Sequence, residues 1–225
     1  MPSRGETDFV RLPPFAAGLY DRMLRGRGPD SHYADLAKDL LAQGARGRLL
    51  DVGTGPGRLL VELRAAAPSL ELHGLDISPA MVALARRTLG SGAELRVGSI
   101  AGTDYPAASF DVVTCSGSFY LWDEPQAGLA EVHRLLAPGG AAHLYESTRD
   151  YDRPALKAAL ARNLAGERLV RRLLAPRFLE RQLAMTYTAE EVRGIVARTP
   201  FAGRCSITPL TLGGLPVWMR VTLRR

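Results

Sequence analysis

An acidic residue followed by three closely spaced glycines is the strongest chemical signal in the chain. The segment Leu49–Leu60 reads LLDVGTGPGRLL, so an apolar strand ends in Asp51, the chain turns, and a helical apolar pattern follows. Glycine has no Cβ and lets the backbone turn tightly and approach a ligand closely. Asp51 can accept hydrogen bonds from a cationic ligand group or balance its charge. The segment is typical of a nucleotide-type cofactor loop at the carboxyl end of a first strand.

A second acidic residue lies 23 positions after Gly53. Asp76 ends another apolar segment, at a distance close to the offset of about 20 residues at which a carboxylate binds ribose hydroxyls. The next residues open a helix, with Ser78 as N-cap and Pro79 at the first helical position. We therefore expect Asp76 to bind a ribose, with an ordinary acid at a helix entry as the alternative.

The glycine spacing distinguishes between cofactors. Dinucleotide-dependent dehydrogenases use G-x-G-x-x-G, whereas this loop reads G-x-G-x-G with an acid two residues before it. It resembles motif I of the class I S-adenosylmethionine (SAM) methyltransferases. Residues 98–111 (GSIAGTDYPAASFD) and 135–140 (LLAPGG) are similar to later motifs of that family, in the right order. Over about residues 45–148 the chain resembles the ubiquinone/menaquinone-biosynthesis branch, methyltransferase type 11.

This resemblance implies SAM as cofactor, S-adenosylhomocysteine (SAH) as product, and no metal. It implies a cofactor site made of Tyr20, Asp51, Gly53, Thr54, Gly55, Asp76, Ile77, Met81, Ser99, Ile100 and Ser116. Ile77 and Met81 would lie beside the adenine, and Tyr20 would reach the methionyl carboxylate. The family usually has Asp where this chain has Ser99, whose hydroxyl accepts a hydrogen bond without charge.

Methyl transfer from a sulfonium is an in-line displacement, so alignment of the reactants is the main task of the protein. A general base is needed only where the acceptor must lose a proton. The candidate bases are Glu146, Asp123, Tyr120 and His32, and the sequence favours none of them. The aromatic stretch Phe119–Trp122 and the cap residue Tyr33 are expected near the acceptor. The same aromatic stretch could equally well pack in the core of the protein.

The elements that must position these residues alternate along the chain. Strands are predicted at 47–52, 70–75, 93–98, 110–115 and 140–146, and helices at 57–67, 79–89 and 124–136. This alternation predicts an α/β fold, a Rossmann-like doubly wound sheet that is mostly parallel. Helices are also expected at 15–26, 31–43 and 188–198. A closing hairpin is expected at 203–209 and 215–223, as in the family.

We expect a single methyltransferase domain over residues 1–225. Its parts are an N-terminal helical cap (1–44), a SAM-binding core (45–148), a helical insertion for the substrate (149–186), and the last helix with the closing strands (187–225). The insertion is expected to be interrupted at Pro176, because proline breaks or kinks a helix.

Composition limits the remaining possibilities. The formal net charge is +6, and residues 149–225 carry an excess of nine positive charges, which could face an anionic substrate or nucleic acid, or only solvent. The sequence contains no run of 18 apolar residues, so no membrane span is predicted. The first residues lack the apolar region of a secretory signal, and two cysteines are too few for a disulfide framework. A cytoplasmic monomer or homodimer is expected.

Three functions are therefore compatible with the sequence. The first is methylation of a small molecule of aromatic or anionic character, at oxygen, nitrogen or carbon. The second is methylation of RNA or protein through the basic insertion, which would make binding sensitive to salt. The third is SAM binding without turnover. A nicotinamide-dependent dehydrogenase is disfavoured by the glycine spacing.

Overall fold

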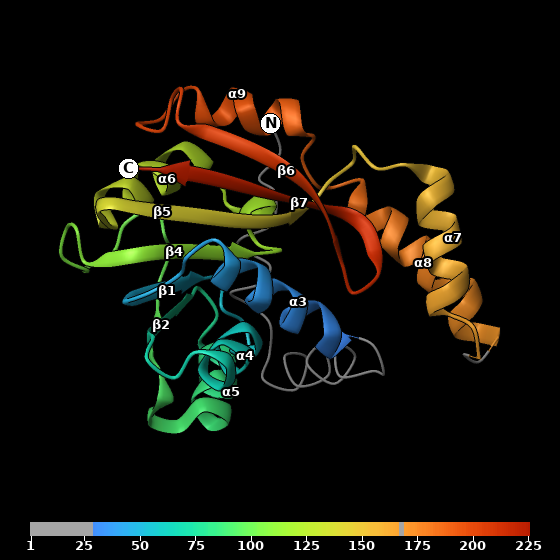
Figure 1. Ribbon diagram of the computed structural model, residues 1–225, viewed down its shortest axis with the longest axis horizontal. Coiled ribbons are helices and arrows are strands. Elements are labelled where there is room, and N and C mark those ends of the chain that lie inside the picture. Colours follow the sequence, from blue (N-terminus) through green and yellow to red (C-terminus); the bar gives the residue numbers. More distant parts are fainter. Residues whose placement is uncertain (1–28, 167–168) are drawn as a thin grey trace.

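The computed structural model describes residues 29–166 and 169–225, which build a seven-stranded sheet between helices (Figure 1). The strands are β1 (Arg48–Val52), β2 (Glu71–Asp76), β3 (Glu94–Val97), β4 (Phe110–Ser116), β5 (Leu136–Ser147), β6 (Cys205–Leu212) and β7 (Leu215–Arg224). Their order is β3-β2-β1-β4-β5-β7-β6. β1 to β5 pair in parallel, and β7 runs antiparallel to both of its neighbours. The predicted mostly parallel, Rossmann-like sheet is confirmed.

Helices cover both faces of this sheet. The longer ones are α3 (Pro29–Ala42), α4 (Arg58–Ala66), α5 (Pro79–Leu89), α6 (Pro125–Leu135), α7 (Arg153–Asn163), α8 (Leu169–Leu183) and α9 (Ala189–Val196). Two short 3₁₀ turns, η1 (Gly90–Gly92) and η2 (Phe119–Leu121), complete the connections. Figure 1 shows α6 and α9 on the side of the sheet opposite α3, α4 and α5.

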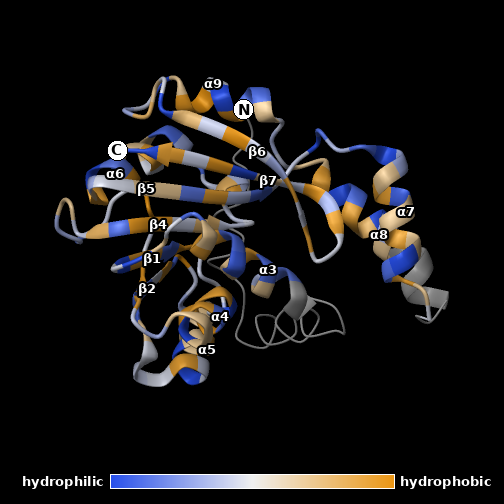
Figure 2. Cartoon of the chain, in the orientation of Figure 1, coloured by the Kyte–Doolittle hydropathy of each residue, from blue (hydrophilic) through white to orange (hydrophobic). Residues whose placement is uncertain are grey.

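Alternation of side chains along the strands supplies one core to each layer of helices. Leu49 and Val112 belong to the cluster with α3, α4 and α5, whereas their neighbours Leu50 and Val113 belong to the cluster with α6 and α9. Successive residues of a strand point to opposite faces, so a strand buried on both sides reads as a continuous apolar run. Figure 2 shows this hydrophobic colouring along the central strands, with hydrophilic residues on the outer helices.

Local signals set the ends of several helices. The Ser78 hydroxyl accepts a hydrogen bond from the Met81 amide at 3.4 Å, and Pro79 begins α5. At α9, Thr188 and Glu191 form a reciprocal capping box. The Ser78 N-cap is placed where the sequence predicts it.

The expected interruption at Pro176 is wrong: α8 runs through this residue, and the break in the insertion falls between α7 and α8. The helix expected at 15–26 lies outside the described residues. α7 and α8 project beyond the sheet, packing on it through Leu156, Leu183 and Val217 (Figure 1). Within the described residues, no helix is long and apolar enough to cross a membrane.

Candidate functional site

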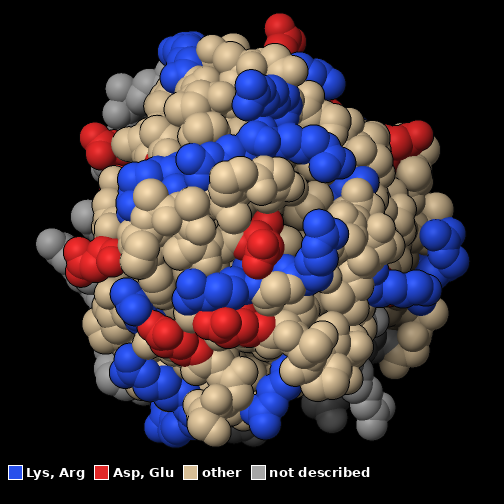
Figure 3. Space-filling model, turned by 60° about the vertical axis from the view of Figure 1, so that its left-hand side comes forward, with Lys and Arg blue, Asp and Glu red and all other residues tan. Residues whose placement is uncertain are grey.

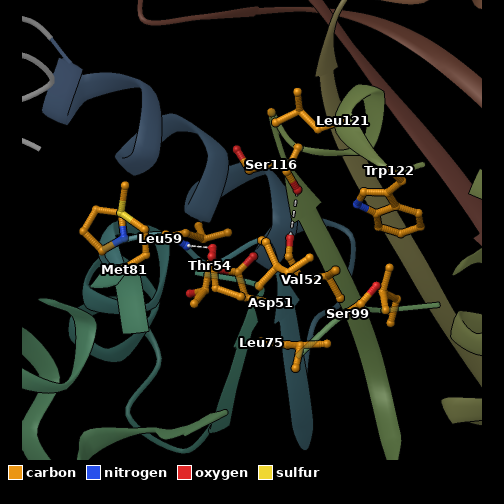
Figure 4. Close-up of a pocket in the computed structure, with 18 of the residues that line it drawn as sticks. Asp51, Val52, Thr54, Leu59, Leu75, Met81, Ser99, Ser116, Leu121 and Trp122 are labelled. Carbon is orange, nitrogen blue, oxygen red and sulfur yellow. Dashed lines mark hydrogen bonds between the residues drawn. The ribbon is translucent and has the colours of Figure 1, made fainter. Parts of the chain in front are cut away.

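A pocket lies at the carboxyl ends of β1, β2 and β4 (Figure 4). Its empty volume is about 1080 Å³, a value that includes the open mouth. The residues predicted for cofactor binding that line it are Asp51, Gly53, Thr54, Gly55, Asp76, Ile77, Met81, Ser99, Ile100 and Ser116. Tyr20, the remaining predicted residue, lies outside the described part of the chain. Segments far apart in sequence therefore meet where ligands bind in open α/β sheets.

The glycine loop needs its glycines for two separate reasons. Gly53, Gly55 and Gly57 have φ angles of 71°, 53° and 80°, in the left-handed region that side chains rarely adopt. A Cβ atom on Gly53 would also lie 2.1 Å from the Ser118 hydroxyl oxygen, which leaves no room for a side chain. The backbone thus turns tightly from β1 into α4 while it lies against the end of β4.

Asp76 is held rigidly at the pocket. One carboxylate oxygen accepts a hydrogen bond from the Gly55 amide and the other accepts one from the Ser78 amide, each at 2.8 Å. Burial raises the pKa of Asp76, and these two backbone hydrogen bonds oppose the shift. Each oxygen keeps a second lone pair for a ligand hydroxyl. This geometry suits a carboxylate that receives two neighbouring hydroxyl groups.

Asp51 is in a different situation. Its side chain is 2 % exposed, and its Oδ1 atom has no hydrogen-bond partner among the described residues. Burial raises the pKa of Asp51 to about 7, and the nearby Asp76 carboxylate adds to the shift. A buried carboxyl with an unpaired oxygen is unfavourable until a donor arrives, above all a cationic one. Asp51 therefore fits a positively charged ligand group.

The opposite wall of the pocket is apolar and aromatic. Ile100 and Trp122 are buried side chains that pack against Gly128 of α6, where a Cβ would come within 2.6 Å of the Trp122 ring. Ser99 also lines this side, and its hydroxyl accepts a hydrogen bond from the Ala101 amide at 3.2 Å. A flat, largely apolar ring would find matching surface here.

Only one of the four candidate bases lies at the pocket. Tyr120 lines it, whereas Glu146, Asp123 and His32 are not among the lining residues. Glu146 is 1 % exposed and lies beneath the η2 turn, and Asp123 is exposed. The His32 ring packs near the rings of Tyr33 and Trp218. Tyr120 is thus the one predicted candidate base that lines the pocket.

Two further elements contribute to the pocket. Tyr33 of α3 lines it, and Gln182 of α8 lines it as well. Nothing in the sequence pattern around Gln182 distinguishes it from other polar residues of the insertion. The described residues hold no cluster of three or more His, Cys, Asp or Glu side chains suited to a metal ion.

Comparisons with known proteins agree with this geometry. Residues 49–140 match the family described as "Methyltransferase domain". The demethylmenaquinone methyltransferase of Deinococcus radiodurans is 41% identical over 113 residues, which cover 49% of this chain and 46% of that protein. The enzyme of the same name from Thermus thermophilus is 36% identical over 125 residues, which cover 54% and 56%. The chain spans about half the length of these relatives.

The fold also has solved counterparts. The plantazolicin methyltransferase BamL, in complex with a triazolic desmethylPZN analogue and SAH, superposes with a TM-score of 0.71 at 15% identity. The superposition covers 99% of this chain and 95% of that one. At this identity the likeness concerns the fold alone. The sequence matches confirm the resemblance to methyltransferases that the glycine loop and the later motifs predicted, and the superposition confirms the fold.

Proposed function

We propose that this chain, whose residues 49–140 match a methyltransferase domain, transfers a methyl group from SAM to a small-molecule acceptor and releases SAH. The observation that carries this proposal is the separation of roles between two carboxylates in one pocket. Asp76 is fixed by two amides to receive a pair of hydroxyls, and Asp51 presents an unpaired buried oxygen. A ribose and an amino-acid ammonium group, joined in one molecule, match this pair.

The other residues of the pocket divide between the two ends of such a ligand. Ile77 and Met81 would pack on the adenine side, with Ser99 and the Ile100 backbone at its edge. When bound, SAM supplies a methyl group already activated by its sulfonium. The chain then has to align the acceptor and exclude water, for which Tyr33, Tyr120, Leu121, Trp122 and Gln182 line the remaining wall.

The charge around the pocket supports an uncharged, aromatic acceptor over an anionic one. Among the described residues that line the pocket there is no Lys or Arg. Lys and Arg instead form a band on the face that includes the left-hand side of Figure 1, where β5 begins and β7 ends (Figure 3). An anionic acceptor would need cations beside it. The basic insertion is therefore no argument for a nucleic-acid acceptor in this pocket.

Calorimetric titration with SAM, SAH and NAD tests the cofactor, with Asp76→Ala as the matched variant. We expect micromolar binding of the two adenosyl ligands and no binding of NAD. The variant loses two hydrogen bonds to a charged group, so its affinity should fall by about 100-fold or more. Unchanged SAH affinity in Asp76→Ala would refute the ribose assignment.

Turnover is then tested with SAM and a panel of acceptors that begins with aromatic and quinone-like metabolites, with SAH release as the signal. Methylation of such a compound supports the proposal. Tight SAH binding with no methylation of any acceptor in the panel would favour a SAM-binding protein without turnover, and salt-sensitive binding of RNA would favour the nucleic-acid alternative.

A further inference from the structure

A buried polar cluster lies directly beneath the aromatic wall of the pocket. Glu146, at the end of β5, accepts hydrogen bonds at Oε1 from the Ser118 amide (3.0 Å) and the Phe119 amide (2.8 Å). The Cys115 thiol lies 3.8 Å from the same oxygen and 3.0 Å from the Ser118 hydroxyl. The Ser118 hydroxyl in turn donates to the Val52 carbonyl at 3.3 Å. The cluster thus joins the ends of β1, β4 and β5.

Glu146 serves as the cap of the η2 turn. The first amides of a helical turn have no partner within the turn, so a side-chain oxygen placed near them satisfies buried donors. Ser118 precedes the turn but makes no side-chain cap hydrogen bond, so Glu146 supplies the acceptor from another strand. The residues that follow these capped amides include Tyr120, Leu121 and Trp122, which line the pocket.

The same cluster also fixes the distance between the turn and the glycine loop. The Ser118 hydroxyl bonds to Val52, the residue before Gly53, and occupies the space where a Cβ of Gly53 would lie. The acceptor side and the cofactor side of the pocket are therefore connected through a few buried atoms. A shift of the turn would be transmitted to the loop.

Keeping an acid at this position is costly for the fold. Glu146 is 1 % exposed, its Oε2 atom has no hydrogen-bond partner among the described residues, and burial raises its pKa to about 8. A leucine would fill such a site without this penalty. The carboxyl group therefore has a role that compensates for this cost, and the turn that it caps is the feature it contacts.

We propose that Glu146 is a positioning residue that holds the aromatic wall, and above all Trp122, at a fixed place relative to the glycine loop. It acts through the Ser118 and Phe119 amides and touches neither substrate nor cofactor. As a statement about acceptor placement, this inference rests on the proposed function. As a statement about the turn, it can be tested without any acceptor.

Trp122 itself is the probe. The chain has two tryptophans, so a Trp218→Phe background leaves Trp122 as the only one. Glu146→Ala leaves two buried amides without an acceptor. The equilibrium between the closed η2 turn and an open form, in which these amides reach water, should therefore shift toward the open form by at least about tenfold. We expect a red shift of Trp122 emission and stronger quenching by acrylamide. Glu146→Gln keeps a carbonyl oxygen for both amides and should resemble the parent protein.

Thr222→Ala is the matched control. It removes a hydroxyl that is also buried in the sheet and bonded to His143, away from the pocket. Its Trp122 signal should equal that of the parent. Unchanged Trp122 fluorescence in Glu146→Ala, or the same change in Thr222→Ala, would overturn the proposal, because the effect would then be absent or general.

Two further readouts keep the test decisive. If Glu146→Ala does not fold, Glu146→Asp keeps the carboxyl but shortens its reach to the two amides, and it should still shift the Trp122 signal; no shift would count against the proposal. SAH titration of the parent protein is run alongside. If the parent protein does not bind SAH, the proposed function is refuted, and the fluorescence comparison still decides the role of Glu146.

Discussion

Replacing Asp51 by Asn should stabilise the ligand-free protein at alkaline pH while it removes cofactor binding. The folded-state pKa of about 7 lies above the ordinary value of 3.8, so the folded protein holds a proton that the unfolded chain has lost. The free energy of unfolding therefore falls as pH rises from about 4 to about 7, and stays reduced above that. At about 1.4 kcal/mol per pH unit, the loss amounts to about 4 kcal/mol as an upper bound.

An asparagine does not ionise, so the variant should lack this pH-dependent loss. Its amide brings donors that also need partners, at about 1–3 kcal/mol. At pH 8 we therefore expect a net gain of roughly 1–3 kcal/mol over the wild type, or roughly 2–12 °C in Tm for a chain of this size. At pH 4 the gain should vanish or reverse. SAH should raise the Tm of the wild type and leave that of Asp51→Asn unchanged.

Thermal unfolding of both proteins from pH 4 to pH 8, with and without SAH, measures these effects, and the difference between the proteins cancels other titrating groups. Asp123→Asn, at an exposed position, is the control for loss of one charge. Below pH 7, ligand binding must also displace the Asp51 proton, so SAH affinity should weaken by about tenfold per pH unit. Parallel stability curves for wild type and Asp51→Asn would refute the assignment of a buried, protonated Asp51.

Three further predictions follow from single contacts. Gly53→Ala forces a left-handed φ on alanine and a clash with Ser118, so we expect a loss of about 2 kcal/mol or more and weaker SAH binding, measured by thermal unfolding and calorimetry. Tyr145→Phe removes the hydrogen bond from a buried hydroxyl to Asp39 (2.8 Å), and urea unfolding should show about 1–3 kcal/mol less stability with an unchanged m-value. Thr188→Ala removes one half of the α9 capping box and should cost about 1 kcal/mol in the same assay; a neutral result would mean that the cap is not formed in solution.

The cofactor side of the pocket was predictable because its signals are local in sequence. The glycine loop, Asp76 and the Ser78 cap lie within about thirty residues, and each has a backbone reason for its residue type. Short apolar strands that alternate with helices also restrict the topology to a few arrangements. The central sheet followed from these signals with small differences at the strand ends.

The acceptor side depends on facts that the local pattern does not contain. Glu146 is the second-last residue of β5, in which Tyr145 packs with α3 and Leu144 packs on the opposite face. The alternation of the strand therefore points Glu146 beneath the η2 turn and away from the pocket. A register change of one residue would have reversed this. Gln182 reaches the pocket because of how α8 packs against the sheet, a long-range arrangement with no periodic signature.

The place of β7 in the sheet has a consequence for synthesis on the ribosome. β5 pairs with β4 along one edge and with β7 along the other. The pairs with β7, such as Ser147 with Trp218, join residues that lie some 70 positions apart along the chain. Until that stretch has left the exit tunnel, one edge of the apolar strand β5 stays unpaired. We expect nascent chains released before residue 215 to recruit chaperones or aggregate, and chains that include β7 to escape both fates.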